Sequence, residues 1–364
     1  MTTTPLQPNI DEYLRRRLMP VEGSIPALAG IEMYGNSIPA GIVGGDLFEY
    51  INFQQRYDIE ARVARALHLS TAYLEPLPPA ESPRNSVDVH VRWLESRPGF
   101  TSSMATEYRK AKSSEQVRIA EELRQLFGIA GVLLVDAEGH GIISAKIAST
   151  VHDTFHALML CELDLYGGVT PAFFEQLNLR LAQSVTARNA LGRNPNDGIR
   201  EIATMLYGEI HPSGHFRFVN FGHPPPLIFS SKSQEFKLVD RDRMAQFPPL
   251  GLEIPEDHPD RNKYFSMTFR KKEMDSSDIA DLALINRGDI LFLYTDGVYD
   301  GSDKHIRLQI EQIIRDHIDH PAKEICNAIL QFAVTQDAHL RQINEADRID
   351  DKTVFIIKRT QQYI

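Results

Sequence analysis

The sequence predicts an α+β fold: a β-sandwich of two antiparallel sheets flanked by helices in αββα layers, with a mostly helical insertion. Short runs of β-branched and aromatic residues arrive in hairpin-like sets, and segments with helical periodicity separate these sets. We therefore expect the helices to pack on the outer faces of the sheets. The chain has 364 residues, of which 42% are hydrophobic, so it can fill a sizeable core.

The expected elements follow in order along the chain. A short helix over 10–18 is stopped by Pro20, and β-like runs broken by Gly and Pro occupy 31–53. The apolar run GVLLV is bounded by glycine and reads as a buried strand, and the turn HPSG joins two strands as a hairpin. Strands are expected at 131–135, 201–210, 215–221, 227–229, 264–271, 289–294 and 353–358, and helices directly after residue 141 and at 170–189, 305–317 and 321–336.

Composition excludes several classes of partner and cofactor. The formal net charge of −10 offers no basic surface for nucleic acid or for an anionic membrane. Only Cys161 and Cys326 occur, so we expect neither a disulfide framework nor a cysteine metal cage, and a reducing cytoplasm suits the chain. We find neither a signal peptide nor the run of ~20 apolar residues that a bilayer span requires.

The stretch VGGDLFEY over 43–50 raises the question of what Asp46 does. An aspartate behind two glycines is often a turn former, and the string also partly matches the GGDEF motif of nucleotide cyclases. Other aspartates share its position beside an apolar strand and a turn: Asp136 follows GVLLV, Asp296 follows ILFLYT, and Asp350 precedes KTVFIIKR. Carboxylates that converge from strand ends repel one another unless cations lie between them.

Oxygen ligands without a cysteine or histidine pattern favour hard ions such as Mg²⁺ or Mn²⁺. Two such ions can activate water and neutralise phosphate charge, so this pattern favours phosphoryl chemistry.

Five motifs in order, VGGDLFEY, LLVDAEGHG, FVNFGHPPPLIF, LFLYTDGVYDG and DDKTVFII, resemble those of the metal-dependent type 2C-like protein phosphatases (PPM superfamily) in their bacterial SpoIIE/RsbU-like branch. The resemblance implies two Mn²⁺ or Mg²⁺ ions in a cleft at one end of the sandwich. Asp136 would bridge both ions, the Ala137 carbonyl would bind one, and Asp296 and Asp350 would complete the shell of the other. Asp46 would reach the site directly or through water.

Several positions leave alternatives open at this point. Asp351 adjoins Asp350 and could exchange roles with it, and the family usually has a second aspartate where Glu49 stands. His140 and His223 lie inside motifs and could act as general acids, but we favour structural roles for both. An activated water already supplies the nucleophile, and three prolines fix the loop after His223.

We divide the chain into an N-terminal lead-in with a short helix, 1–19, and a phosphatase domain, 20–360, that is interrupted by a helical insertion at 56–128 with a candidate regulatory role. Helical stretches at 58–67 and 115–127 flank a proline-rich linker in the insertion. We expect the insertion to emerge near the cleft or the sheet edge beside it. It could then be a lid, a docking surface, a dimer element or a passive decoration.

The resemblance implies a phosphoserine/phosphothreonine protein phosphatase in which an activated water attacks phosphorus in line. Its implied substrate is a phosphorylated STAS-type anti-sigma-factor antagonist in partner-switching signalling. A regulatory protein or a second copy of the chain could bind through the N-terminal helix or the insertion. The alternative is a pseudophosphatase, a signalling module that binds a phosphoprotein without turnover; a diguanylate cyclase has only the GGD string in its favour.

Overall fold

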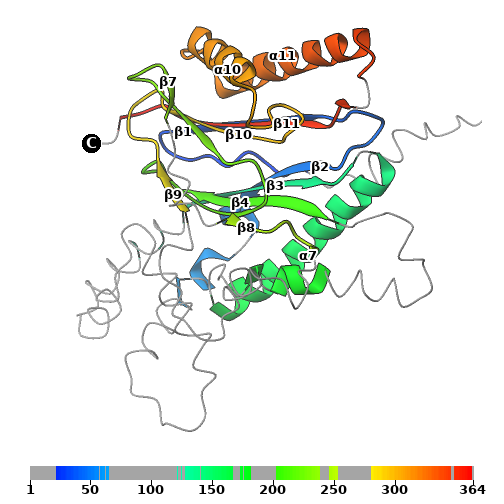
Figure 1. The fold of residues 1–364 in the computed structure, drawn as a ribbon. Helices are drawn as coiled ribbons and strands as arrows, with labels where there is room; N and C mark the ends of the chain where they lie inside the picture. Colours follow the sequence, from blue (N-terminus) through cyan, green and yellow to red (C-terminus); the bar gives the residue numbers. More distant parts are fainter. Residues whose placement is uncertain are drawn as a thin grey trace, which may run out of the picture.

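The computed structural model describes residues 22–56, 58–61, 63–64, 121, 124, 128–139, 141–166, 173–174, 176–181, 202–237, 246–252, 280–345 and 348–362. Two β-sheets lie face to face in the middle of the molecule, and helices cover their outer faces (Figure 1). The predicted αββα sandwich is therefore confirmed. Within the described ranges, none of the helices has the length and apolarity needed to cross a bilayer.

The first sheet has five strands in the order β1-β11-β10-β6-β7, and every neighbouring pair is antiparallel. Its strands are β1 (Ile31–Ile38), β6 (Leu227–Ser230), β7 (Glu235–Lys237), β10 (Ile290–Tyr294) and β11 (Lys352–Arg359). Strand β11 is central to this sheet and is buried along its whole length. It brings residues from the end of the chain beside residues near its start.

The second sheet has six strands, in the order β2-β3-β4-β5-β8 with β9 also paired to β5. Its strands are β2 (Asp46–Asn52), β3 (Ala130–Ala137), β4 (Ala203–Ile210), β5 (His215–Phe221), β8 (Gln246–Phe247) and β9 (Ala280–Ala283). All pairs are antiparallel except the short β5–β8 contact, which is parallel. The short strands β7, β8 and β9 were not predicted.

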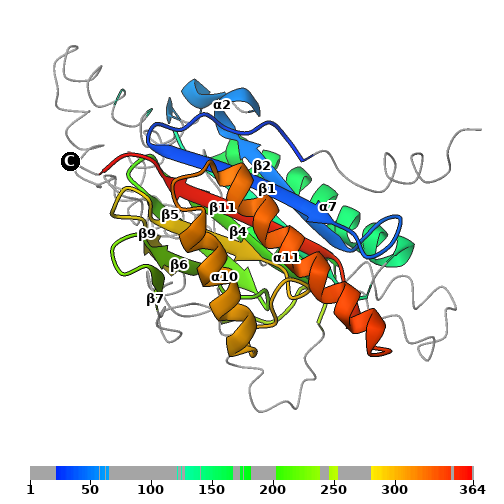
Figure 2. The same ribbon diagram turned by 90° about the horizontal axis from the view of Figure 1, so that it is seen from above.

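The helices α10 (Lys304–Asp316) and α11 (Ala322–Gln342) cover the first sheet, and α7 (Ile142–Tyr166) covers the second (Figures 1 and 2). Asp303 caps α10 by accepting hydrogen bonds from the backbone N–H groups of the first turn. On α11, Ile325, Ile329 and Ala333 are buried against the sheet side and Phe332 is partly buried. A further helix, α2 (Phe53–Arg56), is a single turn after β2.

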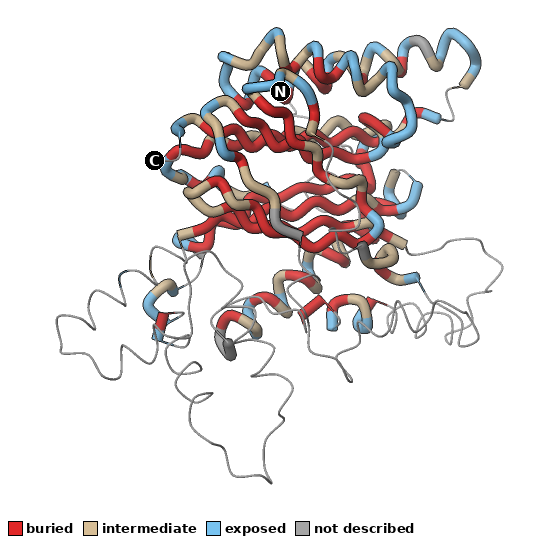
Figure 3. Tube along the Cα trace, turned by 60° about the vertical axis from the view of Figure 1, so that its left-hand side comes forward, coloured by how far each residue is buried: buried red, intermediate tan, exposed pale blue. Residues whose placement is uncertain are grey.

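Three apolar layers hold these elements together, and Figure 3 shows the buried tube concentrated in the two sheets. Side chains alternate along each strand, so one set fills the space between the sheets and the other faces the helices. On β2, for example, Phe48 and Tyr50 lie between the sheets, whereas Leu47 and Ile51 pack in the layer that contains α7. We call the middle layer the inter-sheet core.

The structure corrects the expected position of the insertion at 56–128. Strands β2 and β3 pair with Asp46 opposite Asp136 at one end and Asn52 opposite Ala130 at the other. The chain leaves β2 and enters β3 at the Asn52–Ala130 end, about 20 Å along the strands from the aspartates. The expectation that the insertion emerges beside the cleft is therefore wrong.

A few residues of the insertion are described, and all of those between 59 and 124 are helical. Near its start, Asp58 accepts hydrogen bonds from the backbone of Glu60 and Ala61. Near its end, Arg124 pairs with Glu60, with Nη2 donating to Oε2 at 2.7 Å. The two ends of the insertion are thus joined to each other. The predicted helix at 10–18 and strand at 264–271 lie outside the described residues.

A buried histidine fixes the loop between β5 and β6. The Nδ1 atom of His223 lies 2.8 Å from the Thr204 hydroxyl, and the backbone of His223 exchanges two hydrogen bonds with the Asn220 side chain. Burial lowers the pKa of His223 to about 3, against a smaller opposing contribution from the backbone of Tyr294. A neutral imidazole at pH 7 supports the expected positioning role rather than proton transfer.

Replacing Gly208 by alanine should destabilise the protein by about 1–3 kcal/mol, because the inter-sheet core has no room for the added methyl group. A Cβ atom at this position would overlap the tip of the buried Phe216 ring. Urea unfolding checks the result. Gly41→Ala is the matched control, since its Cβ would meet only Val43 O, at 3.8 Å, and it should change the free energy by less than about 0.5 kcal/mol. Equal stability of Gly208→Ala and wild type would contradict this packing.

The free energy of unfolding should fall as the pH drops from about 6.5 toward 3, partly because His223 binds a proton only in the unfolded chain. Above the pKa of His223 in the unfolded chain, about 6.5, the imidazole is neutral in both states and its contribution to stability is complete. Below that pH the unfolded chain binds a proton that the folded protein does not, so the free energy of unfolding falls by up to about 1.4 kcal/mol per pH unit. Between about pH 7 and about pH 5, wild type should therefore lose about 2 kcal/mol more than His223→Gln. Urea titrations of both proteins measure this difference, and parallel losses would refute the assignment.

Candidate metal centre

The ends of β2 and β3 bring two predicted ligands together. Asp46 and Asp136 are directly opposite in the antiparallel register, so their Cβ atoms are about 4.5–5.5 Å apart. Both point toward the inter-sheet core, because they alternate in phase with Phe48 on β2 and Leu134 on β3. The two carboxylates therefore share one end of the space between the sheets.

Asp46 is also bonded to the opposite sheet. Its Oδ2 atom accepts hydrogen bonds from the Thr295 hydroxyl at 2.6 Å and the Thr353 hydroxyl at 2.8 Å. Thr295 directly follows β10 and Thr353 lies in β11, and both are fully buried. Burial raises the pKa of Asp46 well above its ordinary value, Asp136 raises it further, and the two hydroxyls oppose the shift. A single carboxylate thus links both sheets.

Asp296 and Asp350 complete the group. Burial raises the pKa of Asp136 to about 8, and Asp296, Asp350 and then Asp351 add to the shift through their negative charges. Partial burial of its carboxyl and the charge of Asp350 raise the pKa of Asp296. The charge of Asp136 thus acts on Asp46, and the charges of Asp296 and Asp350 act on Asp136. We call the four predicted ligands, Asp46, Asp136, Asp296 and Asp350, the aspartate cluster.

Asp351 makes different contacts from its neighbour Asp350. Its Oδ1 accepts the backbone N–H of Ala40 and its Oδ2 accepts that of Gly45, both at 2.6 Å. Within the described residues, the Asp350 carboxylate accepts the N–H of Asp351 at 2.8 Å through Oδ1. Asp351 therefore fastens the loop between β1 and β2, whereas Asp350 keeps an oxygen for another ligand.

The two glycines before Asp46 are required by close packing. A Cβ atom on Gly44 would lie 2.5 Å from the Asp351 carboxyl, and one on Gly45 would lie 2.6 Å from the Ala137 carbonyl oxygen. The N–H of Ala137 donates to Gly45 O at 3.2 Å. These contacts bring the predicted carbonyl ligand of Ala137 beside the loop that carries Asp46, and any larger residue would displace it.

The residues of the cluster fit a divalent metal. They offer carboxylate oxygens and a carbonyl oxygen, the ligands that Mg²⁺ and Mn²⁺ prefer. Several buried carboxylates raise one another's pKa, and a cation between them would remove that repulsion. The same donors would suit Zn²⁺ poorly, since no cysteine or histidine is among them.

Glu49 does not belong to the aspartate cluster. It lies in phase with Leu47 and Ile51 on the face of β2 that is turned toward α7, the face opposite Asp46. There it contacts His152 and His156 of α7. Glu49, the second acidic residue of VGGDLFEY, therefore has a role in this chain other than that of a ligand in the aspartate cluster. His140 lies outside the described residues.

Sequence reasoning missed the hydroxyls that hold the cluster. Thr295 comes directly before Asp296, and Thr353 follows two residues after Asp351. Thr204 is opposite Asp136 in the β3–β4 register and connects it to His223. The two threonines stand next to the predicted ligands in the strings LYTDG and DDKT, but only the stacking of the two sheets shows that both hydroxyls meet Asp46.

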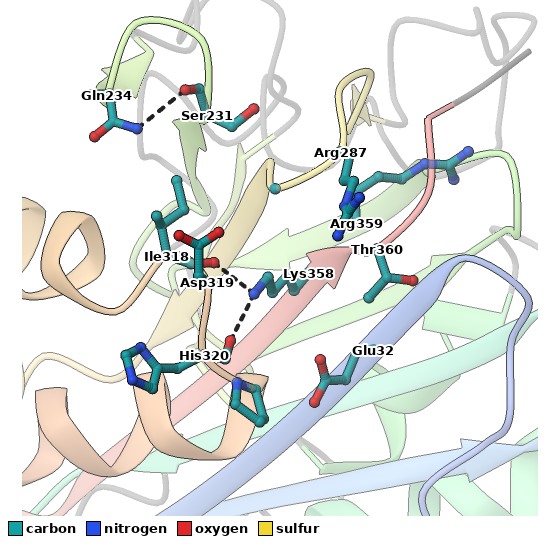
Figure 4. A pocket seen from close by; sticks show the side chains of 12 residues that line it. Glu32, Ser231, Gln234, Arg287, Ile318, Asp319, His320, Lys358, Arg359 and Thr360 are labelled. Carbon is teal, nitrogen blue, oxygen red and sulfur yellow. Dashed lines mark hydrogen bonds between the residues drawn. The ribbon is translucent and has the colours of Figure 1, made fainter.

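A separate polar hollow of about 560 Å³ lies at the other end of the first sheet, where β11 ends (Figure 4). None of the four aspartates lines it. Lys358 donates to the carbonyl oxygens of Ile318 and His320, both at 2.6 Å, and Arg359 donates to Gln361 O at 2.8 Å. These cations serve to hold backbone segments together.

Comparisons with known proteins identify a curated relative of this chain. The chain is 25% identical over 229 residues to phosphoserine phosphatase RsbP of Bacillus subtilis (strain 168), which covers 62% of this chain and 45% of RsbP. The chain thus spans less than half the length of this curated relative.

Two solved structures are similar at low identity. The RsbU and RsbW domains of Rv1364c from Mycobacterium tuberculosis match at 15% identity and a TM-score of 0.48, covering 93% of this chain and 62% of that one. The PP2C phosphatase domain of SpoIIE from Bacillus subtilis, with a fragment of its regulatory domain, matches at 12% identity and a TM-score of 0.46, covering 91% and 64%.

The family model of stage II sporulation protein E (SpoIIE) matches residues 128–267 and 282–360, which is more than half of the chain. The chain therefore belongs to the SpoIIE family.

Proposed function

We propose that this protein is a Mn²⁺- or Mg²⁺-dependent phosphoserine/phosphothreonine protein phosphatase. The observation that carries the proposal is the pairing of Asp46 with Asp136 at one end of the inter-sheet core, where the buried Asp46 carboxylate also accepts hydrogen bonds from Thr295 and Thr353 of the opposite layer. An arrangement of this kind costs stability without a cation, so its retention supports a metal-dependent activity. Membership of the SpoIIE family supports the same reaction class.

Two divalent ions would be held by the residues that the resemblance implies. Asp136 would contact both, with the Ala137 carbonyl as a further ligand of one and Asp296 and Asp350 as ligands of the other. Asp46 would act through Oδ1, directly or through water, because its Oδ2 already accepts from two threonines. The bound ions would supply water activation and neutralisation of phosphate charge.

The chain's own residues would keep this centre in place. Thr295 and Thr353 hold Asp46, and Asp351 fixes the loop that carries Gly44 and Gly45. Because Asp46 and Asp136 lie in β2 and β3, and Asp296 and Asp350 lie within two residues of β10 and β11, the ligands need little rearrangement when the substrate arrives. The centre would favour in-line hydrolysis with no covalent phosphoenzyme.

We propose a phosphorylated protein as the substrate, with a STAS-type anti-sigma-factor antagonist as the specific candidate. The relative RsbP is named a phosphoserine phosphatase, and similar solved structures carry RsbU and RsbW domains or belong to the bacterial stressosome. The insertion at 56–128 would then serve as a docking or dimer surface, since its two ends lie far from the aspartate cluster.

Asp136→Asn should lower metal-dependent phosphatase activity by at least about 100-fold, because several kcal/mol of transition-state stabilisation depends on the ions. Release of phosphate from an aryl phosphate and from a phosphoserine peptide in Mn²⁺ measures this loss. Asp316→Asn, an exposed position on α10, is the matched control and should keep full activity. Mn²⁺ binding by wild type without phosphate release would indicate the non-catalytic binding module instead.

Asp350→Asn and Asp351→Asn should have opposite effects. In Asp350→Asn the new amide oxygen can still accept from the N–H of Asp351 and charge repulsion is relieved, so metal-free stability should stay within about 0.5 kcal/mol while Mn²⁺ affinity is lost. In Asp351→Asn the new NH₂ group faces a backbone N–H that the carboxylate oxygen accepted before. The free energy of unfolding without metal should therefore fall by about 1–3 kcal/mol. Urea unfolding in the presence of a chelator measures the metal-free stability of each variant, and calorimetry with Mn²⁺ measures its metal affinity. If Asp351→Asn alone lost Mn²⁺ affinity, with unchanged stability, the assigned roles would be reversed.

A further inference from the structure

A second group of potential ligands lies between β2 and α7, on the side of β2 away from the aspartate cluster. Glu49 is buried there, and its Oε2 atom lies 3.0 Å from His152 Nε2 and 2.5 Å from His156 Nε2. The two histidines are four residues apart, so they lie on one face of α7. Their ring centroids are 4.5 Å apart.

The convergence of three polar atoms suits a metal better than hydrogen bonds alone. Without an ion, either both Nε2–H groups donate to Oε2, or one donates while a protonated Oε2 donates to the other nitrogen. One divalent ion would replace both protons and bind all three atoms. The ligand atoms of the three residues lie within 4.8 Å of one another.

Distances and access fit a four-coordinate ion. Zinc bonds of about 2.0–2.2 Å to nitrogen and oxygen place neighbouring ligands of a tetrahedron about 3.3–3.5 Å apart. The Oε2–Nε2 separations of 3.0 and 2.5 Å are shorter than this spacing, so the Glu49 and His156 side chains would move apart by up to about 1 Å to admit the ion. The His152 and His156 side chains are 13% and 20% exposed, so an ion can enter from solvent and water can fill the fourth position. His152 Nδ1 also lies 3.4 Å from the Asp153 carboxylate, an outer partner that would orient the ring.

We propose that Glu49, His152 and His156 form a second metal site, which binds a divalent transition-metal ion of the Zn²⁺ type. Imidazole ligands select such ions, whereas the oxygen ligands of the aspartate cluster select Mg²⁺ or Mn²⁺. The two sites therefore differ in chemistry as well as in the face of β2 that they occupy.

The ion would fasten α7 to the second sheet. One ligand belongs to β2 and two belong to the middle of α7, so the bound ion would join elements that are otherwise held by apolar packing. The first turn of α7 also contacts the turn after β3, where Ser144 Oγ donates to Glu138 O at 3.0 Å. The second site would thus steady the helix that adjoins the Ala137 turn.

Cobalt spectroscopy tests the proposal on the full chain, with Mg²⁺ in large excess to occupy the aspartate cluster. Wild type should bind one Co²⁺ with the intense visible absorption of a four-coordinate ion, and Zn²⁺ should displace it. In His152→Gln/His156→Gln the affinity should fall by more than about 100-fold, since even the loss of an outer-shell partner costs 10–100-fold. Glutamine keeps a donor for Glu49 and suits a helix, so this variant should fold, which circular dichroism checks.

Two control variants make the outcome decisive. Asp136→Asn should keep the cobalt spectrum, because it alters only the aspartate cluster. His320→Gln should also keep it, since His320 faces a single carboxylate, Glu324, at 3.9 Å and is half exposed. The proposal is overturned if wild type shows no four-coordinate cobalt, if the spectrum persists in the double variant, or if Asp136→Asn abolishes it.

Discussion

The carboxylate of Asp46 links the two sheets at the end where the functional residues meet. It comes from β2 of the second sheet, yet its hydroxyl partners Thr295 and Thr353 belong to the first. These bonds only partly offset the burial of a charge beside Asp136, so the pKa of Asp46 stays well above its ordinary value. The contact thus joins the two sheets at this end. A cation there would offset the cost of burying the Asp46 charge beside Asp136.

In the sandwich, the apolar layers supply stability and the ends of the strands carry the candidate functional residues. Apolar side chains fill the inter-sheet core and both helix-covered faces, and they stabilise the strands whose ends carry the charges. Asp351 and the glycines at 44 and 45 then let the loop approach the cluster closely. Because the strand ends are fixed by long antiparallel ladders, the core can tolerate the repulsion between carboxylates at its edge.

Sequence periodicity predicted the layers and most strands, because alternation and glycine turns are local signals. It also identified the aspartates, since each stands at a strand end. It could not show that Thr295 and Thr353 both meet Asp46, because these contacts join residues 249 and 307 positions apart across the two sheets. Nor could it show that the insertion leaves from the far end, because that depends on the register of β2 against β3. The spacing of His152 and His156 was visible in the sequence, but their partner Glu49 lies 103 positions from His152.

We propose that the aspartate cluster is a cation site built from both sheets. Anomalous diffraction at the manganese edge, from crystals grown with Mn²⁺, would locate the ions. Strong peaks should lie within ligand distance of Asp136, Asp296 and Asp350, with the Asp46 bonds to Thr295 and Thr353 intact. Manganese elsewhere on the chain, with the cluster empty and its carboxylates turned apart, would contradict it.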